Sequence, residues 1–359
     1  MYTNIVFVFL VFFTLSFGLT SSDRYSRGSV FLLGIIALLL CSFFIGFRSI
    51  DSGTDTKEYY YYFQYINDFP SRFEFGFEII THIIKNFFDY QVYFFLICFL
   101  TLFLLVVSCH INNVNCLLFL GVSLSFLPGL DLITNGIRNG LSISLGIFIL
   151  SLSMYKSRRI LIAVLLSPIS AAIHISALVF TILLPMASFI SNARFRVKSI
   201  YFISICLFIF FNLMGMDFIR EIVFPYRSQI GFVGKVSRYI LLDDELLSSN
   251  VKFYFYVVSA YLMWFTVAHI ERINNEIIIL LTKVSLLGFL AFSMLYFSAY
   301  SFRFMLLFFF LQVMTCSYII TQNLCRPRTK ILFVLFVFIN MVLTYISKTY
   351  VNMTLLELF

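Results

Sequence analysis

Residues 32–63 read LLGIIALLLCSFFIGFRSIDSGTDTKEYYYYF, and this stretch decides the class of fold. Its first half is almost pure hydrocarbon, and an apolar helix of this kind crosses about 30 Å of lipid. Similar runs recur along the 359 residues, of which 61% are hydrophobic and 12% charged. Soluble domains carry about 25% charged residues, and barrel strands would alternate polar with apolar residues. We therefore predict an all-α polytopic integral membrane protein.

We expect about twelve transmembrane helices in a single transmembrane domain over residues 1–359. The predicted spans cover residues 2–20, 30–47, 92–108, 116–131, 137–155, 160–173, 176–190, 200–216, 253–269, 277–297, 304–322 and 331–347. The run 160–190 is too long for one comfortable span and short for two, so two short spans and a re-entrant hairpin both stay open.

Basic residues indicate the orientation of these spans. The short loops DRYSR (23–27), KSRR (156–159), ARFRVK (193–198) and CRPRTK (325–330) are basic, and such loops stay in the cytoplasm. The segments 48–91 and 217–252 then face outward, together with a turn near His174. The formal net charge of +8 follows from this topology, so no nucleic-acid partner is needed to explain it.

Most motif searches are negative. The seven cysteines form no CxxC pair, which argues against a zinc site and against disulfides. The chain has no Walker loop, no GxGxxG and no GxSxG motif. Its acidic cluster at 243–245 lacks histidine companions. We therefore expect neither a metal ion nor another cofactor.

The residues that can carry chemistry gather on the predicted outward side. Arg48 and Asp55 follow the second span and precede tyrosines 59–62, which suit an aromatic belt or a sugar-stacking wall. Glu74 and Glu78 lie four residues apart in RFEFGFEIITHIIK (72–85). This segment predicts an amphipathic helix in the outer interface, with the two carboxylates on one face.

Three further candidates lie at the ends of predicted spans or in the turns between them. Arg138 opens a span, His174 lies in AAIHISAL, and Arg303 lies between two late spans. An arginine at the centre of a span costs about 2.5–3.5 kcal/mol, so it suggests function, although snorkelling to the surface is the structural alternative. His174 is equally open to a purely structural role. Arg227 and Arg238 help to make residues 218–241 of the second outer segment locally cationic, as expected for contact with anionic head groups.

In this order the residues resemble the EpsG/Wzy-type polysaccharide polymerases of bacterial envelopes. The resemblance rests on Arg48, Gly53-Thr54-Asp55-Thr56, Tyr59, Phe63, Glu74-Phe-Gly-Phe-Glu78, Ile137-Arg138-Asn139-Gly140, Ile173-His174-Ile175-Ser176-Ala177-Leu178 and Arg303-Phe304. Asn139 and Gly140 stand where relatives often carry glutamine and alanine, a departure that leaves Arg138 untouched.

The resemblance implies a glycosyltransferase that joins repeat units of O-antigen, capsule or exopolysaccharide. Such an enzyme transfers undecaprenyl-diphosphate-linked glycan onto the next lipid-linked unit at the outer face of the bacterial cytoplasmic membrane. The family implies a membrane fold related to type-C glycosyltransferases and no tightly bound metal. It also implies a partner protein that regulates chain length, besides the membrane lipids.

On this reading Arg48, Arg138 and Arg303 stabilise the departing diphosphate, with His174 assisting. Asp55 or Glu74 acts as the base on the acceptor hydroxyl. The predicted substrate-binding set is completed by Glu78, Tyr59, Arg227 and Arg238.

Three other functions stay open. A ligase that moves finished glycan to another acceptor usually has one very large late outer loop, and 217–252 is modest in length. A flippase or other transporter should place charges along a central path and often shows repeated halves. A membrane acyltransferase also needs a histidine, but it couples that histidine to a cytoplasmic donor.

Overall fold

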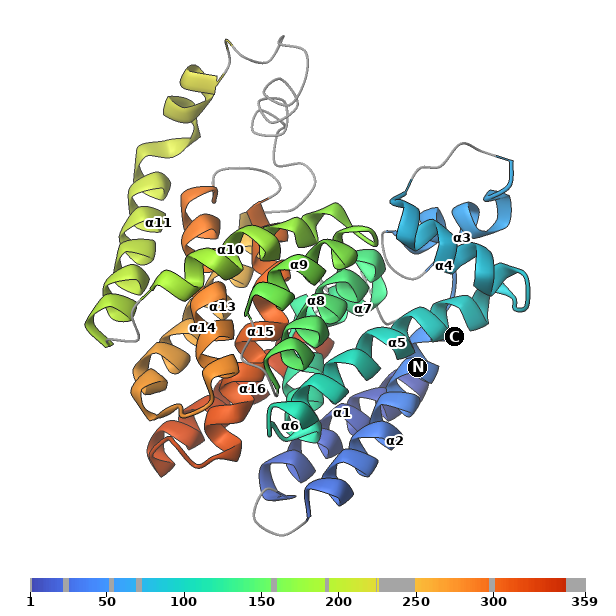
Figure 1. Ribbon diagram of the computed structural model, residues 1–359. Helices are drawn as coiled ribbons and strands as arrows, with labels where there is room; N and C mark the ends of the chain where they lie inside the picture. The colour runs from blue at the N-terminus through green and yellow to red at the C-terminus, as the bar shows by residue number, and fades with distance from the viewer. Residues whose placement is uncertain are drawn as a thin grey trace. The chain divides into compact units, whose positions relative to one another are not determined.

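The computed structural model describes residues 2–21, 26–51, 55–68, 73–155, 160–190, 194–223, 225, 249–296 and 301–346 (Figure 1). All regular secondary structure in these residues is helical, which confirms the predicted all-α fold. The internal contacts divide the chain into two units. Unit 1 is Met1–Pro185 with Val313–Phe359, and unit 2 is Met186–Gln312. The single domain over 1–359 stays a prediction.

Unit 1 holds the helices that carry most of the candidate residues. They are α1 (Tyr2–Ser21), α2 (Arg27–Gly46), α3 (Thr56–Tyr65), α4 (Phe75–Lys85), α5 (Tyr90–Ile111), α6 (Cys116–Leu124), α7 (Leu127–Thr134), α8 (Ile137–Tyr155), α9 (Ile160–Ala171), the 3₁₀ turn η1 (Ile175–Ala177), the first part of α10 (Leu178–Phe189), the last part of α15 (Ser301–Thr321) and α16 (Pro327–Ile346).

Unit 2 contains the rest of α10 and α15, together with α11 (Arg194–Val223), α13 (Ser249–His269), the 3₁₀ turn η4 (Ile270–Arg272) and α14 (Glu276–Met294). Here α11 packs along α14 and α13. Lys283 is buried in α14, and its Nζ donates to the carbonyl of Ile190 at 2.6 Å. This lysine within an apolar helix therefore has a structural partner.

The long helix α5 is central to unit 1, because it packs along both α2 and α8. Asp89 caps its start by accepting from the Val92 N–H at 3.0 Å. At the α2 contact a Cβ on Gly46 would lie 2.4 Å from the Cα of Phe95. The two helices approach so closely that only glycine fits at this position.

Every predicted span overlaps a helix, but the number of spans stays a prediction. Six helices of the described residues are long and apolar enough to cross a membrane, or seven if one bent pair counts as a span. The remaining apolar helices are shorter. For example, α9 has 12 residues, about 18 Å at 1.5 Å a residue. The chain is thus a multi-pass membrane protein, and the figure of about twelve spans remains a prediction.

The bent pair corrects one expectation. The sequence predicts a continuous span over 116–131, whereas α6 and α7 meet at 92°. Phe126 between them has an extended backbone, with φ −114° and ψ 141°. Pro128 stands in the first turn of α7, where its missing N–H costs nothing, so a new helix starts there in another direction.

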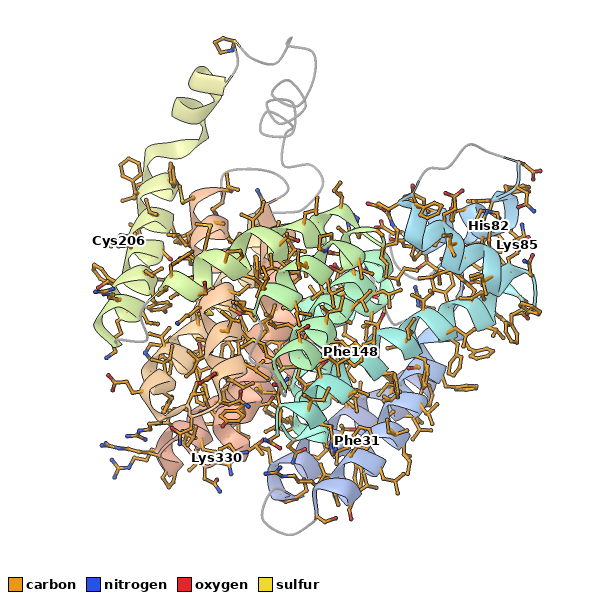
Figure 2. The ribbon with its side chains drawn as sticks, viewed as in Figure 1. Phe31, His82, Lys85, Phe148, Cys206 and Lys330 are labelled. Atoms are coloured by element: carbon orange, nitrogen blue, oxygen red, sulfur yellow. The ribbon has the colours of Figure 1, made fainter. Side chains whose placement is uncertain are left out.

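The expected amphipathic helix is present as α4, and with α3 it forms a helical cap at the start of α5 (Figure 1). On α4 the side chains of Phe77 and Thr81 are buried, whereas those of Phe75, Ile79 and Ile83 are exposed. Figure 2 shows His82 and Lys85 on this cap, far from Phe31 at the opposite end of α2. The cap therefore lies at the end of unit 1 that the charge pattern places outside.

Candidate functional site

An aromatic cluster forms the base of the candidate site. It is built from α3, α4, α5 and the residue before Glu74, and it comprises Tyr59, Phe63, Phe73, Phe77, Tyr90, Tyr93 and Phe94. The run of four tyrosines divides between two environments. Tyr59 is 5% exposed and Tyr62 packs on Phe73 at 4.3 Å, whereas Tyr61 is 58% exposed. Part of the run is thus protein core rather than interfacial belt or sugar wall.

Glu74 lies on this cluster and joins three segments of the chain. Its Oε2 accepts from Nη1 of Arg138 at 2.8 Å. Its Oε1 accepts from Nδ1 of His174 at 2.7 Å and from the backbone N–H of Ile175 at 3.2 Å. Glu74 precedes α4 with an extended backbone and makes no capping bond to its own helix. The Glu74 carboxylate therefore binds residues that are distant in sequence and does not cap its own helix.

A second contact fixes this arrangement. The N–H of Gly76 donates to the carbonyl of Ala172 at 2.8 Å. A Cβ on Gly76 would lie 2.7 Å from that same carbonyl oxygen, too close for any other residue without movement. Residues 74–76 and 172–175 are thus joined in both directions, because one side accepts where the other donates.

Arg138 lies at the first turn of α8, with about a fifth of its side chain exposed. Its guanidinium covers the ring of Phe73 at 3.9 Å, and its Nε donates to the hydroxyl of Tyr59 at 3.5 Å. A cation on an aromatic face is stabilised by the electrons of the ring, more so where water is scarce. The aromatic cluster and Glu74 together hold this arginine in one orientation.

The electrostatics keep Glu74 ionised. Burial raises the pKa of Glu74, but the hydrogen bond and charge of His174 and the Ile175 N–H outweigh it, and the pKa falls to about 2. A carboxylate can only accept, so Nδ1 of His174 must be the donor. In the neutral imidazole Nε2 is then the acceptor nitrogen, free of the Glu74 contact. A histidine that is oriented by a carboxylate in this way can act as a general base through its other nitrogen.

Neighbouring polar residues extend the group. The hydroxyl of Ser176 donates to Oδ1 of Asn139 at 2.8 Å, which ties η1 to α8 one residue beyond Arg138. The quoted motifs contain Ser176, Asn139 and Gly76, but local spacing assigns them no role. Phe73, the platform of Arg138, also escapes sequence reasoning. Its only signal is the alternation of phenylalanine at 73, 75 and 77.

Arg48 contacts the same aromatic cluster through Phe94 rather than through Glu74, and it is 2% exposed. Its guanidinium donates to the carbonyls of Ile45 and Thr134 and to the hydroxyl of Thr56, and it covers the ring of Phe94 at 4.6 Å. Burial lowers the pKa of Arg48 to about 10, so it stays charged at neutral pH. These contacts are those of a residue that joins α2, α3 and α7. Its predicted diphosphate role stays a prediction.

The other predicted residues are not joined to Glu74 by these contacts. Asp55 precedes α3 without capping it, and Glu78 lies 4.0 Å from His82. The expected pairing of Glu74 with Glu78 is thus replaced by contacts to Arg138 and His174. The backbone of Arg303 begins α15, but its side chain lies outside the described residues, as do Arg227 and Arg238. Their predicted roles remain predictions.

No group of three or more histidine, cysteine or carboxylate side chains within the described residues could hold a metal ion.

A comparison with protein-family models matches residues 30–357 to the EpsG family. The chain belongs to the EpsG family. The matched region includes α2 from residue 30, all later helices through α16 and every residue of the site, which confirms the resemblance drawn from the motifs. No curated protein and no solved structure matches the chain. Membership supports a polysaccharide polymerase-type function in the membrane for this EpsG-family protein.

Proposed function

We propose that this EpsG-family protein polymerises lipid-linked oligosaccharide repeat units at the outer face of the bacterial cytoplasmic membrane. The donor is a glycan on undecaprenyl diphosphate, and the acceptor is a hydroxyl of the next lipid-linked unit. The observation that carries the proposal is the single carboxylate of Glu74, held between Arg138 and His174 at 2.8 and 2.7 Å. This arrangement places a cation and a potential base on opposite oxygens of one carboxylate.

The transfer requires one proton acceptor and one anion stabiliser. The acceptor oxygen forms a bond to the anomeric carbon of the donor sugar, while the bond from that carbon to the diphosphate oxygen breaks. The diphosphate leaves with the electron pair. Nε2 of His174 takes the proton of the attacking hydroxyl, and Glu74 stabilises the imidazolium that results. Glu74 thus acts through His174 as a positioning residue.

Arg138 is the proposed diphosphate ligand. One of its nitrogens is used by Glu74 and one by Tyr59, so Nη2 retains donors for phosphate oxygens. Because Phe73 and Glu74 already orient the guanidinium, little reorganisation is needed when charge develops on the leaving group. The ring of Phe73 covers one face of the guanidinium and lowers the local polarity, which strengthens this interaction.

The proposal is tested by complementing a deletion strain with Arg138→Ala and separating its polysaccharide on a gel. We expect the deletion to leave single repeat units and Arg138→Ala to reduce long chains by about 10²–10³-fold, the effect of removing a transition-state donor. Lys57→Ala is the matched control, because Lys57 is an exposed cation of the same cap that pairs with Asp51 at 2.8 Å. Immunoblots of membranes correct for protein abundance.

The outcomes separate the alternative functions. Chains of normal length from a normally inserted Arg138→Ala protein would remove this residue from the mechanism. Units trapped at the cytoplasmic face of the deletion strain would favour a flippase. Long polymer that accumulates on its lipid carrier without reaching a final acceptor would favour a ligase.

A further inference from the structure

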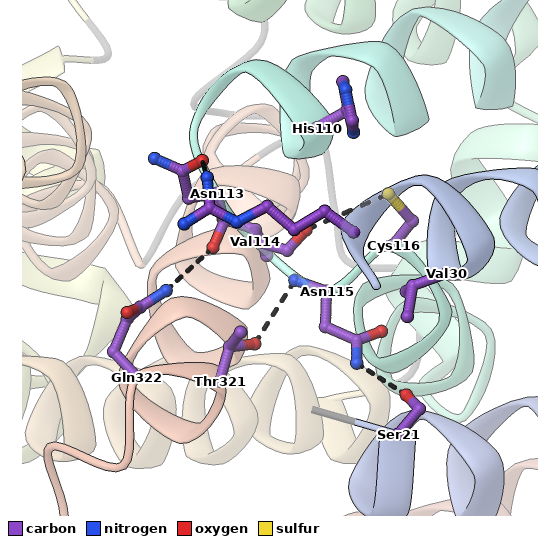
Figure 3. A pocket seen from close by; sticks show the side chains of 10 residues that line it. Ser21, Val30, His110, Asn113, Val114, Asn115, Cys116, Thr321 and Gln322 are labelled. Atoms are coloured by element: carbon purple, nitrogen blue, oxygen red, sulfur yellow. Dashed lines mark hydrogen bonds between the residues drawn. The ribbon is translucent and has the colours of Figure 1, made fainter. Parts of the chain in front are cut away.

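A pocket of about 200 Å³ lies in unit 1 (Figure 3), and its lining does not include Glu74, Arg138 or His174. It opens between the end of α1, the start of α2, the connection from α5 to α6 and the end of α15. Its lining residues are Ser21, Arg27, Val30, His110, Asn113, Val114, Asn115, Cys116, Thr321 and Gln322. No proposed step of the polymerase reaction uses any of them.

The pocket lies at the opposite membrane face from the candidate site. Arg27 and Gly46 are the two ends of α2, whose 20 residues extend about 30 Å. Arg48 and the cap follow the Gly46 end, whereas the pocket lies at the Arg27 end. In the sequence this end adjoins the basic loop 23–27, and the positive-inside rule places that loop and 325–330 in the cytoplasm. The pocket is therefore a separate, cytoplasmic feature.

Hydrogen bonds between distant segments build the pocket wall. Asn113 ends α5 in the left-handed conformation, with φ 59°, and its carbonyl accepts from Nε2 of Gln322 at 3.1 Å. The N–H of Asn115 donates to the Thr321 hydroxyl at 3.2 Å, and its side chain donates to Ser21 at 2.9 Å. Figure 3 shows these bonds joining α1, the α5–α6 connection and α15. The wall is thus formed without a ligand.

The lining has one sign of charge. Arg27 is a permanent cation, and no acidic side chain lines the pocket in the part of the chain that the structure describes. The Arg27 guanidinium donates through Nη1 to Oδ1 of Asn113, its only hydrogen bond within the described ranges. Its remaining N–H groups are available to a ligand with several acceptor oxygens.

We propose that this pocket binds a phosphate ester on the cytoplasmic side. The fork of an arginine suits phosphate oxygens, and the imidazole of His110 adds a further donor. A volume of about 200 Å³ lies below the roughly 300–1,000 Å³ of sites for larger ligands, so a small head group fits better than a sugar chain. The phosphate comes either from an anionic lipid of the inner leaflet or from a soluble metabolite. This inference does not rest on the proposed polymerase reaction.

The test measures binding to the purified full-length protein in neutral detergent. Short-chain phosphatidylglycerol, glycerol 3-phosphate and inorganic phosphate are titrated separately, and the rise in melting temperature reports occupancy. We expect Arg27→Gln to weaken binding about tenfold or more and His110→Gln to weaken it less. Arg328→Gln is the matched control, because Arg328 is an exposed cation near this face that does not line the pocket.

Each outcome decides between the sources or against the site. Binding of phosphatidylglycerol alone, lost in Arg27→Gln, identifies a lipid head group. Binding of glycerol 3-phosphate or inorganic phosphate with the same dependence identifies a soluble ligand. If none of the three binds, or if Arg27→Gln and Arg328→Gln bind equally well, the proposal is wrong. Arg27→Lys guards against misfolding, since it keeps the charge and should retain part of the affinity.

Discussion

Glu74 is the residue on which the candidate site depends, because one carboxylate accepts from Arg138, from His174 and from a backbone N–H. The Arg138 side chain comes from the start of α8, whereas His174 and the N–H of Ile175 are neighbours in the turn after α9. Loss of the charge therefore affects both the cation and the proposed base. Glu74→Gln keeps the size of the side chain while it removes the ion pair.

The acidity of Glu74 predicts a pH dependence of stability. Its pKa in the folded protein is about 2, below the ordinary 4.5, so its contribution is complete above about pH 4.5 and is lost as the pH falls toward 2. We expect the unfolding midpoint to fall more steeply in the wild type than in Glu74→Gln over that range. Thermal unfolding of both proteins from pH 6 to pH 2.5 measures this. Parallel curves would show that Glu74 is not stabilised in its ionised form.

Arg48 predicts a different result from Arg138. Arg48→Ala leaves the buried carbonyls of Ile45 and Thr134 without their donor, and each such loss costs about 1–3 kcal/mol. We expect this variant to melt at a clearly lower temperature than the wild type. Arg138 is more exposed, so Arg138→Ala should lower the melting temperature less. An Arg48→Ala protein that melts normally but makes no polymer would instead support the diphosphate role.

At the scale of elements, the start of α4 must lie against the turn after α9. Gly76→Ala inserts a Cβ only 2.7 Å from the carbonyl oxygen of Ala172, so the two segments must separate. We expect a destabilisation of about 1–3 kcal/mol and a loss of polymer, because Glu74 moves with the helix. Melting curves and polysaccharide gels measure the two effects.

A matched glycine tests the specificity of that effect. The Cβ of Gly28→Ala in α2 would meet nothing closer than Oγ of Ser26 at 4.0 Å. This variant should melt and polymerise like the wild type. Equal damage from both alanines would mean that close approach at residue 172 is not the cause.

At the scale of the whole molecule, the cap formed by α3 and α4 and the pocket lined by Arg27 should face opposite compartments. In a Cys206→Ser, Cys325→Ser background the remaining cysteines are buried. We expect a membrane-impermeant maleimide to label His82→Cys in intact spheroplasts, because 41% of the His82 side chain on the cap is exposed. Arg328→Cys should react only after permeabilisation. Labelling of both positions from the same side would contradict the orientation used for the polymerase reaction.

The sequence by itself determined the helical membrane fold, its family and the positions of most helices. These properties are local, because each apolar run must satisfy its backbone hydrogen bonds within its own helix. The turn at His174 also follows from local charge. The 92° bend between α6 and α7 does not follow from local sequence. A proline such as Pro128 can either kink one continuous helix or begin a new helix in another direction.

Only the tertiary structure decided which polar residues meet. Glu74 contacts Arg138 and His174, residues 64 and 100 positions away, in place of the nearby Glu78. The tertiary structure also buries Arg48 among backbone carbonyls, although the sequence places this arginine at the exposed end of a span. Such contacts depend on the packing of α4 against α8 and the α9 turn. Helical periodicity specifies which face of a helix a residue occupies, but it does not specify which helix lies opposite.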